Sequence, residues 1–307
     1  MILTAGLTPA WQQILVFDGF RIGEVNRASE AYWCASGKVL NAGIAAHRLG
    51  GASLVLATMG GLPLDEITRQ LVELGVPHRW IVTQTATRVC TTILDRRTHR
   101  ITELVENGRP LSPAELDQFL LAYQQEASKA DVAVIIGSLP AGTPESFYRE
   151  LLQRTACPAV LDFRGQGLLD VLDLKPLVVK PNRDELARTL KCPLATDTEL
   201  LEAMRSLNER GAQWMVVTQG AGAVWVTSAK TCFRLHPPEA PEIVNPIGCG
   251  DIMAAAIAWA TRAGRQMLDA VRFGIAAAGA NLRQLFPGRI DPTFIAPLAE
   301  QVQVEEL

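Results

Sequence analysis

The stretch DVAVIIGSLPAGTPESFYRELLQRTACPAVLDF, residues 131–163, determines the architecture expected of the chain. It opens with an apolar run entering a turn at 131–140, continues into a helix-like segment at 144–155, and ends in a second apolar run at 158–163. Apolar strands without alternation are typical of a parallel sheet that is covered on both faces. The stretch therefore predicts a strand–helix–strand unit.

The same alternation continues on both sides of this unit. It predicts a doubly wound α/β fold in one domain, residues 1–307, with a mostly parallel sheet flanked by helices. Ligands of such folds bind beyond the carboxyl ends of the strands, which is where Asp162 and Lys180 fall. The further strands are expected at 53–60, 176–182, 214–220 and 223–228, and the helices at 65–75, 184–190 and 197–211.

Two regions depart from the α/β alternation. Residues 12–38 and 86–105 contain short β-like segments separated by polar residues. They predict a small antiparallel sheet inserted into the α/β body. Such a lid is suited to cover a site or to pair with another subunit.

Composition excludes several classes of protein. The net charge of −3 argues against an electrostatic nucleic-acid binder. The first 17 residues lack the basic and apolar regions of a cleavable signal peptide, and no apolar run reaches the roughly 18 residues of a membrane helix. We therefore expect a cytoplasmic protein with no membrane partner. The six cysteines and four histidines are scattered, so no zinc site is predicted.

The segment NPIGCGDIMAAAIAWA, residues 245–260, places glycines at the start of an apolar helix. Backbone N–H groups at a helix start have no partner within the helix, and the helix dipole adds positive charge there. Gly248, Cys249 and Gly250 are therefore expected to form a cradle for an anion such as phosphate. The alternative is a glycine-rich turn with Asp251 as an ordinary first-turn acid.

Asp251 adds a proton acceptor to this cradle. An anion site next to a carboxylate is the minimum needed to transfer a phosphoryl group onto a hydroxyl. The chain contains no Walker A sequence, so a P-loop enzyme is excluded.

Five segments together resemble the ribokinase and phosphofructokinase-B family of sugar kinases. The N-terminal LTPA and GEVNR are similar to its hexose-phosphate kinase branch, which includes 1-phosphofructokinase and tagatose-6-phosphate kinase. The resemblance covers nearly the whole chain and implies the family's ribokinase-like fold. The five segments are SGKVLNAGIAAHRLGG (36–51), GSLPAG (137–142), VVKPNRDEL (178–186), VVTQGAGAV (216–224) and GCGD (248–251).

The resemblance implies ATP and Mg²⁺ as cofactors. Asp251 would be the catalytic base, while Gly248, Cys249 and Gly250 would donate N–H groups to the phosphoryl group. Asn182 and Glu185 would bind magnesium and its waters; the alternative is that Asn182 is a helix N-cap and Glu185 a surface acid. Lys180 would lie near the triphosphate; the alternative is an ordinary cation at a strand end. Thr218, Gly220 and Gly222 would form a nucleotide-binding turn; the alternative is an ordinary hairpin turn. Asn281 would lie near the adenine.

On the acceptor side, Asn41 resembles the ligand of a sugar hydroxyl, and Gly37 would allow close approach of the sugar. Lys38 and Arg88 are candidates for a phosphate already present on the acceptor. Arg27 is a third candidate. The alternative for these cations is a set of ordinary surface charges.

Three acceptor-side positions depart from the family pattern. Gln12 stands where the family usually carries an aspartate, so an amide replaces a charged sugar ligand. Ser36 and Val39 stand where glycines are usual, and we expect their Cβ atoms to intrude on the sugar site. Cys249 also replaces a smaller residue.

These observations predict an ATP-dependent kinase that phosphorylates a hydroxyl of a sugar phosphate. One alternative is a kinase for a free sugar or nucleoside, and another is a catalytically silent sugar- or nucleotide-binding protein. The expected partners are small molecules and a second subunit that forms a homodimer through the lid.

Overall fold

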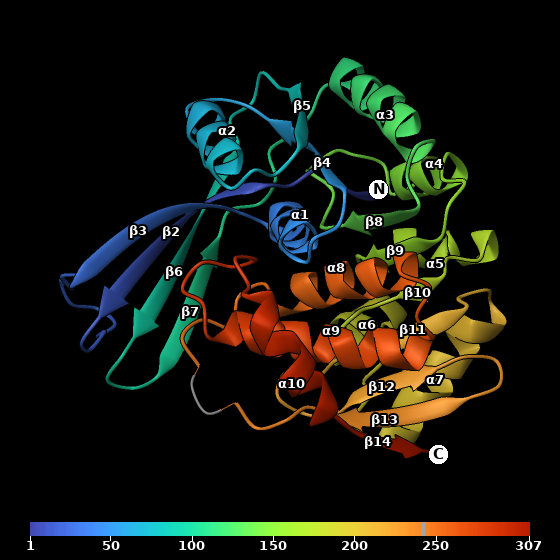
Figure 1. Cartoon of the computed structure of the whole chain (residues 1–307). Coiled ribbons are helices and arrows are strands. Elements are labelled where there is room, and N and C mark those ends of the chain that lie inside the picture. The colour runs from blue at the N-terminus through green and yellow to red at the C-terminus, as the bar shows by residue number, and fades with distance from the viewer. Residues whose placement is uncertain (241–242) are drawn as a thin grey trace.

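The computed structural model describes residues 1–240 and 243–307. Their main sheet runs in the order β14-β13-β12-β11-β10-β9-β8-β1-β4-β5 (Figure 1). The strands from β5 to β11 pair in parallel, and β12 to β14 continue antiparallel at one edge. This confirms the mostly parallel sheet. The strands are β1 (Ile2–Gly6), β4 (Ser53–Met59), β5 (His78–Val82), β8 (Val132–Ile136), β9 (Ala159–Asp162), β10 (Val178–Val179), β11 (Trp214–Val217), β12 (Val224–Thr227), β13 (Cys232–His236) and β14 (Gln303–Glu306).

Helices cover both faces of this sheet. The alternating side chains of each strand divide between two apolar cores, so that Ile2 packs in one and Leu3 in the other. The first core includes α1 (Lys38–Arg48), α2 (Pro63–Glu73), α8 (Cys249–Arg262), α9 (Met267–Leu282) and α10 (Ile295–Glu300). The second includes α3 (Pro113–Ala127), α4 (Phe147–Gln153), α5 (Gln166–Leu169), α6 (Arg183–Leu190) and α7 (Asp197–Glu209), and two short 3₁₀ helices are η1 (Leu172–Leu174) and η2 (Pro292–Phe294).

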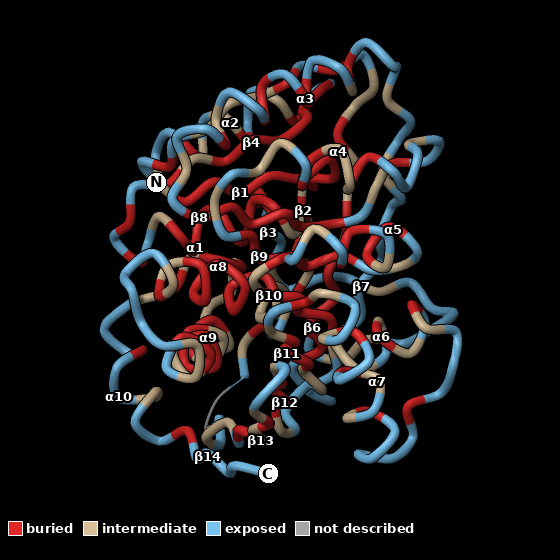
Figure 2. Tube along the Cα trace, turned by 90° about the vertical axis from the view of Figure 1, so that its right-hand side faces the viewer, coloured by how far each residue is buried: buried red, intermediate tan, exposed pale blue. Residues whose placement is uncertain are grey.

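Helix α8 is buried on nearly all sides. It packs against α1, α9 and the strands β8 and β9, and its alanines keep these neighbours close. Figure 2 shows its tube in the buried colour along almost its whole length. A helix without a polar face belongs inside a domain, which explains the apolar run at 252–260.

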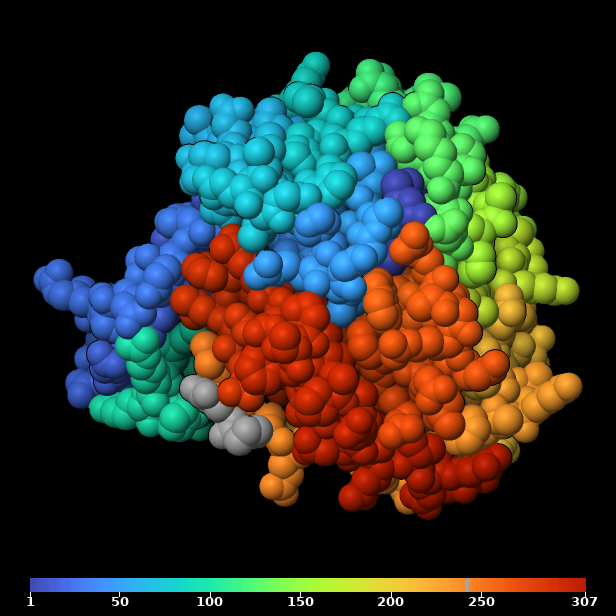
Figure 3. All heavy atoms as spheres, viewed as in Figure 1, coloured from blue at the N-terminus to red at the C-terminus, as the bar shows by residue number. Residues whose placement is uncertain are grey.

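The four lid strands form a separate sheet in the order β3-β2-β6-β7. They are β2 (Ala10–Phe17), β3 (Glu30–Ser36), β6 (Arg88–Asp95) and β7 (Arg100–Val105), and they project from the body in Figures 1 and 3. The predicted antiparallel pairing is wrong for one pair, because β2 and β6 run parallel. Both strands leave the body in the same direction, after β1 and β5 respectively, which forces this pairing.

The lid has one face toward the body and one away from it. On the inner face, Gln12 lies directly between Cys34 and Cys90 on the neighbouring strands, and the adjacent Ile14 packs in a small apolar cluster. On the outer face, Trp33 stacks on Trp11 with ring centroids 5.6 Å apart. Within the described residues, no helix combines the length and the apolar character needed to cross a membrane.

Candidate active site

Helix α8 begins with a backbone turn that only glycine adopts readily. Gly248, its N-cap, has a φ of 85°, and a Cβ there would lie 3.0 Å from Pro287 Cβ and 3.2 Å from Asn41 Nδ2. The N–H of Cys249 donates to Pro246 O at 3.3 Å. Gly250 and Asp251 follow in the first turn, where an α-helix has no backbone acceptor for their N–H groups. The start of α8 thus retains an anion-binding character, centred one residue later than Cys249.

Asp251 lies on the buried side of this first turn. Its Oδ2 accepts a hydrogen bond of 2.8 Å from Asn41 Nδ2, and the residue is only 6% exposed. Burial raises the pKa of Asp251 to about 7; Lys38 opposes this rise, and the negative charge of Asp162 adds to it. A carboxyl group with a pKa near neutrality is suited to accept and release a proton.

Two lysines and two carboxylates gather beside Asp251. Asp162, at the end of β9, lies 2.8 Å from Lys38 Nζ and 2.8 Å from Lys180 Nζ. Lys38 also reaches Glu185 Oε1 at 3.4 Å. Burial alone would raise the pKa of Asp162, but Lys180 and Lys38 hold it below its ordinary value. These side chains come from the carboxyl ends of β9 and β10 and from the starts of α1 and α6.

Lys180 connects this cluster to the anion cradle. A Cβ on Gly250 would lie 3.4 Å from Lys180 Nζ, so the ammonium group sits beside the glycine turn. A lysine at a phosphate site acts as a point charge, which suits the predicted place near a triphosphate.

Asn182 and Glu185 form a capping box at the start of α6. Asn182 Oδ1 accepts from the Glu185 N–H at 2.8 Å, and Glu185 Oε2 accepts from the Asn182 N–H at 3.0 Å. The cap uses the Asn182 carboxamide oxygen, whereas Glu185 Oε1 points to Lys38. Within the described residues, no group of three or more His, Cys, Asp or Glu side chains is arranged to hold a metal.

The proposed nucleotide turn lies directly beside this cap. Thr218 forms a parallel bridge with Asn182, and its carbonyl oxygen accepts from the Arg183 N–H at 2.9 Å. Gly220, with a φ of 62°, and Gly222 lie on the exposed turn that follows. The structure therefore brings the 218–222 turn and the start of α6 to one place.

Asn281 lies behind the anion cradle. It is fully buried on α9, where its Nδ2 donates to Ile247 O at 3.0 Å and its Oδ1 accepts from the Gly288 N–H at 3.0 Å. Its Nδ2 also lies 3.5 Å from Cys249 Sγ. These contacts hold the loop before α8 in place, and an adenine contact of Asn281 stays a prediction.

The acceptor side is built where the lid meets α1. Gly37 has a φ of 88°, and a Cβ there would lie 2.8 Å from Ala10 N, so the close approach is to β2. Asn41 reaches Asp251 across the junction. Gln12 is 2% exposed on the inner lid face, and its Nε2 donates to Thr92 Oγ1 at 2.7 Å.

The side chains of Ser36 and Val39, which were expected to intrude on the sugar site, instead make contacts inside the protein. Ser36 Oγ donates to Asn41 Oδ1 at 3.0 Å, so its side chain is bonded within the protein. Val39 is 1% exposed and packs in the first core, where a Cβ on Gly6 would lie 3.1 Å from Val39 Cβ. The added atoms fill the space between α1 and its neighbours.

Neither Lys38 nor Arg88 is a free cation. Lys38 is paired with Asp162 and Glu185, as described above. Arg88 donates to the carbonyl oxygens of Thr8, Pro9 and Glu106 at 3.0–3.3 Å, which ties the base of the lid together. Arg27 lies exposed in the loop between β2 and β3.

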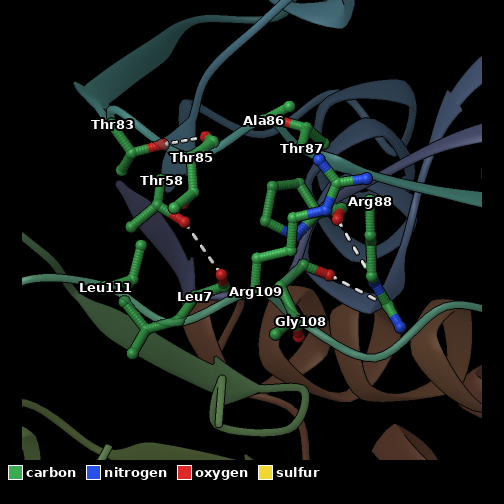
Figure 4. Close-up of a pocket in the computed structure, with 12 residues that line it drawn as sticks. Leu7, Thr58, Thr83, Thr85, Ala86, Thr87, Arg88, Gly108, Arg109 and Leu111 are labelled. Atoms are coloured by element: carbon green, nitrogen blue, oxygen red, sulfur yellow. Dashed lines mark hydrogen bonds between the residues drawn. The ribbon is translucent and has the colours of Figure 1, made fainter. Parts of the chain in front are cut away.

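A small pocket opens beside Arg88. Figure 4 shows Arg88 and Arg109 at one side of it and the threonines 58, 83, 85 and 87 around it. None of the charged residues around Asp251 lines it. This pocket is therefore separate from the charged cluster around Asp251.

Two contacts could not be found from the sequence. Asp162 stood out only as a polar residue at a strand end, and the structure makes it the centre of the lysine cluster. The bond from Ser36 to Asn41 gave no signal, because a helix start does not reveal which way a preceding serine points.

The chain is similar to known proteins over most of its length. The model of the pfkB family carbohydrate kinases matches residues 12–290. The chain is 24% identical to a Thermotoga maritima protein described as "Possible 1-phosphofructokinase", covering 100% of this chain and 99% of that one with a TM-score of 0.89. It is 23% identical to Escherichia coli phosphofructokinase-2, covering 98% and 99% with a TM-score of 0.87.

A structure of Arabidopsis thaliana ribokinase complexed with ribose and ATP is more distant. It is 17% identical, and the match covers 97% of this chain and 98% of that one with a TM-score of 0.75. At these identities the three structures establish the ribokinase-like fold. The family match extends over most of the chain, from the lid to the segment after α9, and this protein therefore belongs to the pfkB family of carbohydrate kinases.

Proposed function

We propose that this carbohydrate kinase transfers the γ-phosphoryl group of ATP to a hydroxyl group of a sugar phosphate. The observation that carries the proposal is Asp251: a buried carboxyl group in the first turn of α8, beside Lys180 and hydrogen-bonded to Asn41. A silent binding protein has no need of a buried base at an anion site. This argues against the catalytically inactive alternative.

Asp251 acts as the general base in this reaction. The acceptor hydroxyl gives its proton to the carboxylate while its oxygen forms a bond to the γ-phosphorus and the bond from that phosphorus to ADP breaks. Oδ2 is occupied by Asn41, and among the described residues no donor binds Oδ1. Oδ1 is therefore the oxygen that faces the hydroxyl.

The start of α8 stabilises the transferring group. The N–H groups of Gly250 and Asp251 and the ammonium of Lys180 provide positive charge where negative charge develops on the phosphoryl oxygens. The ion pair with Asp162, 2.8 Å long, holds Lys180 Nζ in place beside this turn.

Glu185 fits a role toward Mg²⁺. Magnesium commonly takes one or two carboxylates and completes its shell with water and phosphate oxygens, so a single protein carboxylate is sufficient. Glu185 Oε1 points into the cluster, whereas Asn182 Oδ1 is used by the cap. When bound, the ion would neutralise charge on the ATP phosphates.

A phosphorylated acceptor is supported by the fold neighbours. They include Escherichia coli phosphofructokinase-2 in complex with fructose-6-phosphate, with a TM-score of 0.84, whereas the ribose-bound ribokinase scores 0.75. Lys38 and Arg88 both have partners within the protein, so neither side chain by itself requires a phosphate on the acceptor. Arg88 remains the better phosphate candidate, since backbone carbonyls leave its positive charge uncompensated.

The test is magnesium-dependent release of ADP with matched acceptors. Fructose 1-phosphate, fructose 6-phosphate and tagatose 6-phosphate are compared with free fructose, tagatose and ribose, with Asp251→Asn as the inactive control. Turnover of one of the phosphate esters above all the free sugars is expected. Equal or better turnover of a free sugar contradicts the proposal and favours a ribokinase-like or nucleoside acceptor.

Arg88→Ala should raise the KM of the preferred sugar phosphate about 10- to 150-fold, the equivalent of a charge-assisted hydrogen bond. Its carbonyl contacts also anchor the lid, so the KM of ATP and the rate with a free sugar serve as controls. If the KM values of all substrates rise together, Arg88 only anchors the lid.

We further propose a homodimer formed through the lid, in the cytoplasm. The exposed side chains of Trp33 and Leu104 share the outer lid face, which supports burial against a second copy. The six cysteines are all free, as suits a reducing compartment.

A further inference from the structure

Ser36 ends the lid strand β3, two residues before α1 begins. It is 1% exposed, and its Oγ lies 3.0 Å from Asn41 Oδ1. Asn41 in turn is 2% exposed and lies 2.8 Å from Asp251 Oδ2 through its Nδ2. The three buried side chains therefore form one hydrogen-bonded chain that ends at the base.

Chemistry gives this chain a direction. An ionised carboxylate only accepts hydrogen bonds, so Asn41 must present its amide N–H groups to Asp251. The carbonyl oxygen of Asn41 then faces Ser36, whose hydroxyl must donate to it. Each group therefore donates a hydrogen bond to the next, from the serine hydroxyl through the asparagine amide to the carboxylate.

We propose that Ser36 is a positioning residue for the base: its hydroxyl fixes the carboxamide of Asn41 so that an amide N–H points to Asp251 and favours the ionised form of this carboxyl group. Ser36 acts only through Asn41 and touches none of the reacting atoms. The inference rests on the proposed function, in which Asp251 takes the proton of the acceptor hydroxyl.

Without the serine hydroxyl, the carboxamide loses the contact that holds its orientation. Rotation by half a turn would aim the Asn41 carbonyl oxygen at Asp251, where two acceptors repel each other. A hydrogen bond to the charged form of an acid lowers its pKa, so loss of this bond raises the pKa of Asp251. The fraction of ionised base then falls near neutral pH and recovers at higher pH.

The other charged and titratable groups around Asp251 are unaffected by this change. They are Lys38 at the start of α1, Asp162 at the end of β9, Lys180 after β10, and Cys249 on α8 itself. None of them bonds to Ser36. A change in the Asp251 titration when the Ser36 hydroxyl is removed therefore reports on the hydrogen bonds through Asn41.

The experiment compares wild type with Ser36→Ala. The carboxyl ¹³C resonance of Asp251, assigned with Asp251→Asn, is titrated with pH, and the pH profile of kcat/KM is measured for the preferred acceptor. We expect the apparent pKa of Asp251 to rise by about half a pH unit. The acidic limb of kcat/KM should move with it, giving about threefold lower kcat/KM below pH 7 and little change at high pH.

Two further variants make the result specific. Ser36→Thr retains the hydroxyl and should keep the wild-type titration, whereas Ser36→Gly removes it without adding bulk and should behave as Ser36→Ala. Ser53→Ala is the matched control, because Ser53 is a buried serine in β4 whose Oγ has no hydrogen-bond partner among the described residues. It should leave both profiles unchanged.

The proposal is overturned if Asp251 titrates with the same apparent pKa in wild type, Ser36→Ala and Ser36→Gly. It is also overturned if Ser53→Ala changes this pKa as much as Ser36→Ala does. The resonance is titrated without acceptor, so it tests Ser36 even if wild type fails to phosphorylate every sugar phosphate. A failure to phosphorylate any sugar phosphate would contradict the proposed function but not the role of Ser36.

Discussion

At the scale of single residues, Asp251 combines burial, a raised pKa and a position in the first turn of α8. Its place at a glycine-rich helix start was predictable from the sequence, because glycines before an aspartate at a helix start form a recognisable pattern. Its contacts were not predictable: Asn41, Asp162 and Lys180 lie far from Asp251 in the chain, and only the packing of α1 and α8 on the sheet brings them together.

Replacing the base tests its role directly. Asp251→Asn keeps the shape of the side chain but cannot take a proton, so we expect kcat to fall about 10²- to 10⁴-fold while the affinity for ATP stays nearly unchanged. ADP release and nucleotide titration measure the two effects. Asp65→Asn, which removes an exposed first-turn acid from α2, controls for loss of charge at a helix start. Turnover within a few-fold of wild type would refute the role of Asp251.

The same substitution has an effect on stability that depends on pH. Folding raises the pKa of Asp251 from 3.8 to about 7. Such a group stabilises the fold fully below its unfolded-state pKa, and this contribution is lost as the pH rises through about 7. Asn stays neutral, so Asp251→Asn should raise Tm more at pH 8 than at pH 5. An equal change in Tm at both values would mean that Asp251 is ionised in the fold throughout this range.

At the scale of elements, the sequence pattern predicted the alternation of parallel strands and helices, but it missed β1, β5 and α3 and did not give the direction of every strand pairing. The lid strands have the residues of strands, and nothing in them encodes that β2 and β6 run parallel; the direction follows from where each chain segment leaves the body. The start of α6 shows the same limit. The Asn182–Glu185 spacing fits both a helix cap and a magnesium segment, and the structure contains the cap.

The chain provides a control that separates these two roles. Helix α7 begins with an equivalent capping box, Thr196 and Glu199, which is exposed to solvent. Glu185→Gln should raise the Mg²⁺ concentration at half-maximal rate several-fold, because it removes the carboxylate proposed to bind the ion. Glu199→Gln should leave that concentration unchanged, while both variants weaken a cap. If the two variants show the same magnesium dependence, Glu185 is only structural.

At the scale of the whole molecule, the lid carries a prediction about assembly. Trp33 is 42% exposed on the outer lid face and stacks on Trp11. If this face pairs with a second copy, Trp33→Glu should place a charge in the interface and increase the monomer fraction seen by analytical ultracentrifugation. Leu121→Glu, at an exposed position on α3 away from the lid, is the matched control (Figure 1). A wild-type monomer would contradict the dimer.

The position of α8 also has a consequence during synthesis of the chain. Its apolar sides cover α1, β8 and β9, all of which are translated well before it, since even β9 ends at Asp162 and α8 begins at Cys249. Until α8 has left the ribosome, the nascent chain holds an almost complete sheet with one apolar face open to solvent. The chain therefore gains Asp251, the proposed base, together with a large element of its core, and a chain that ends before α8 lacks both and is prone to aggregate.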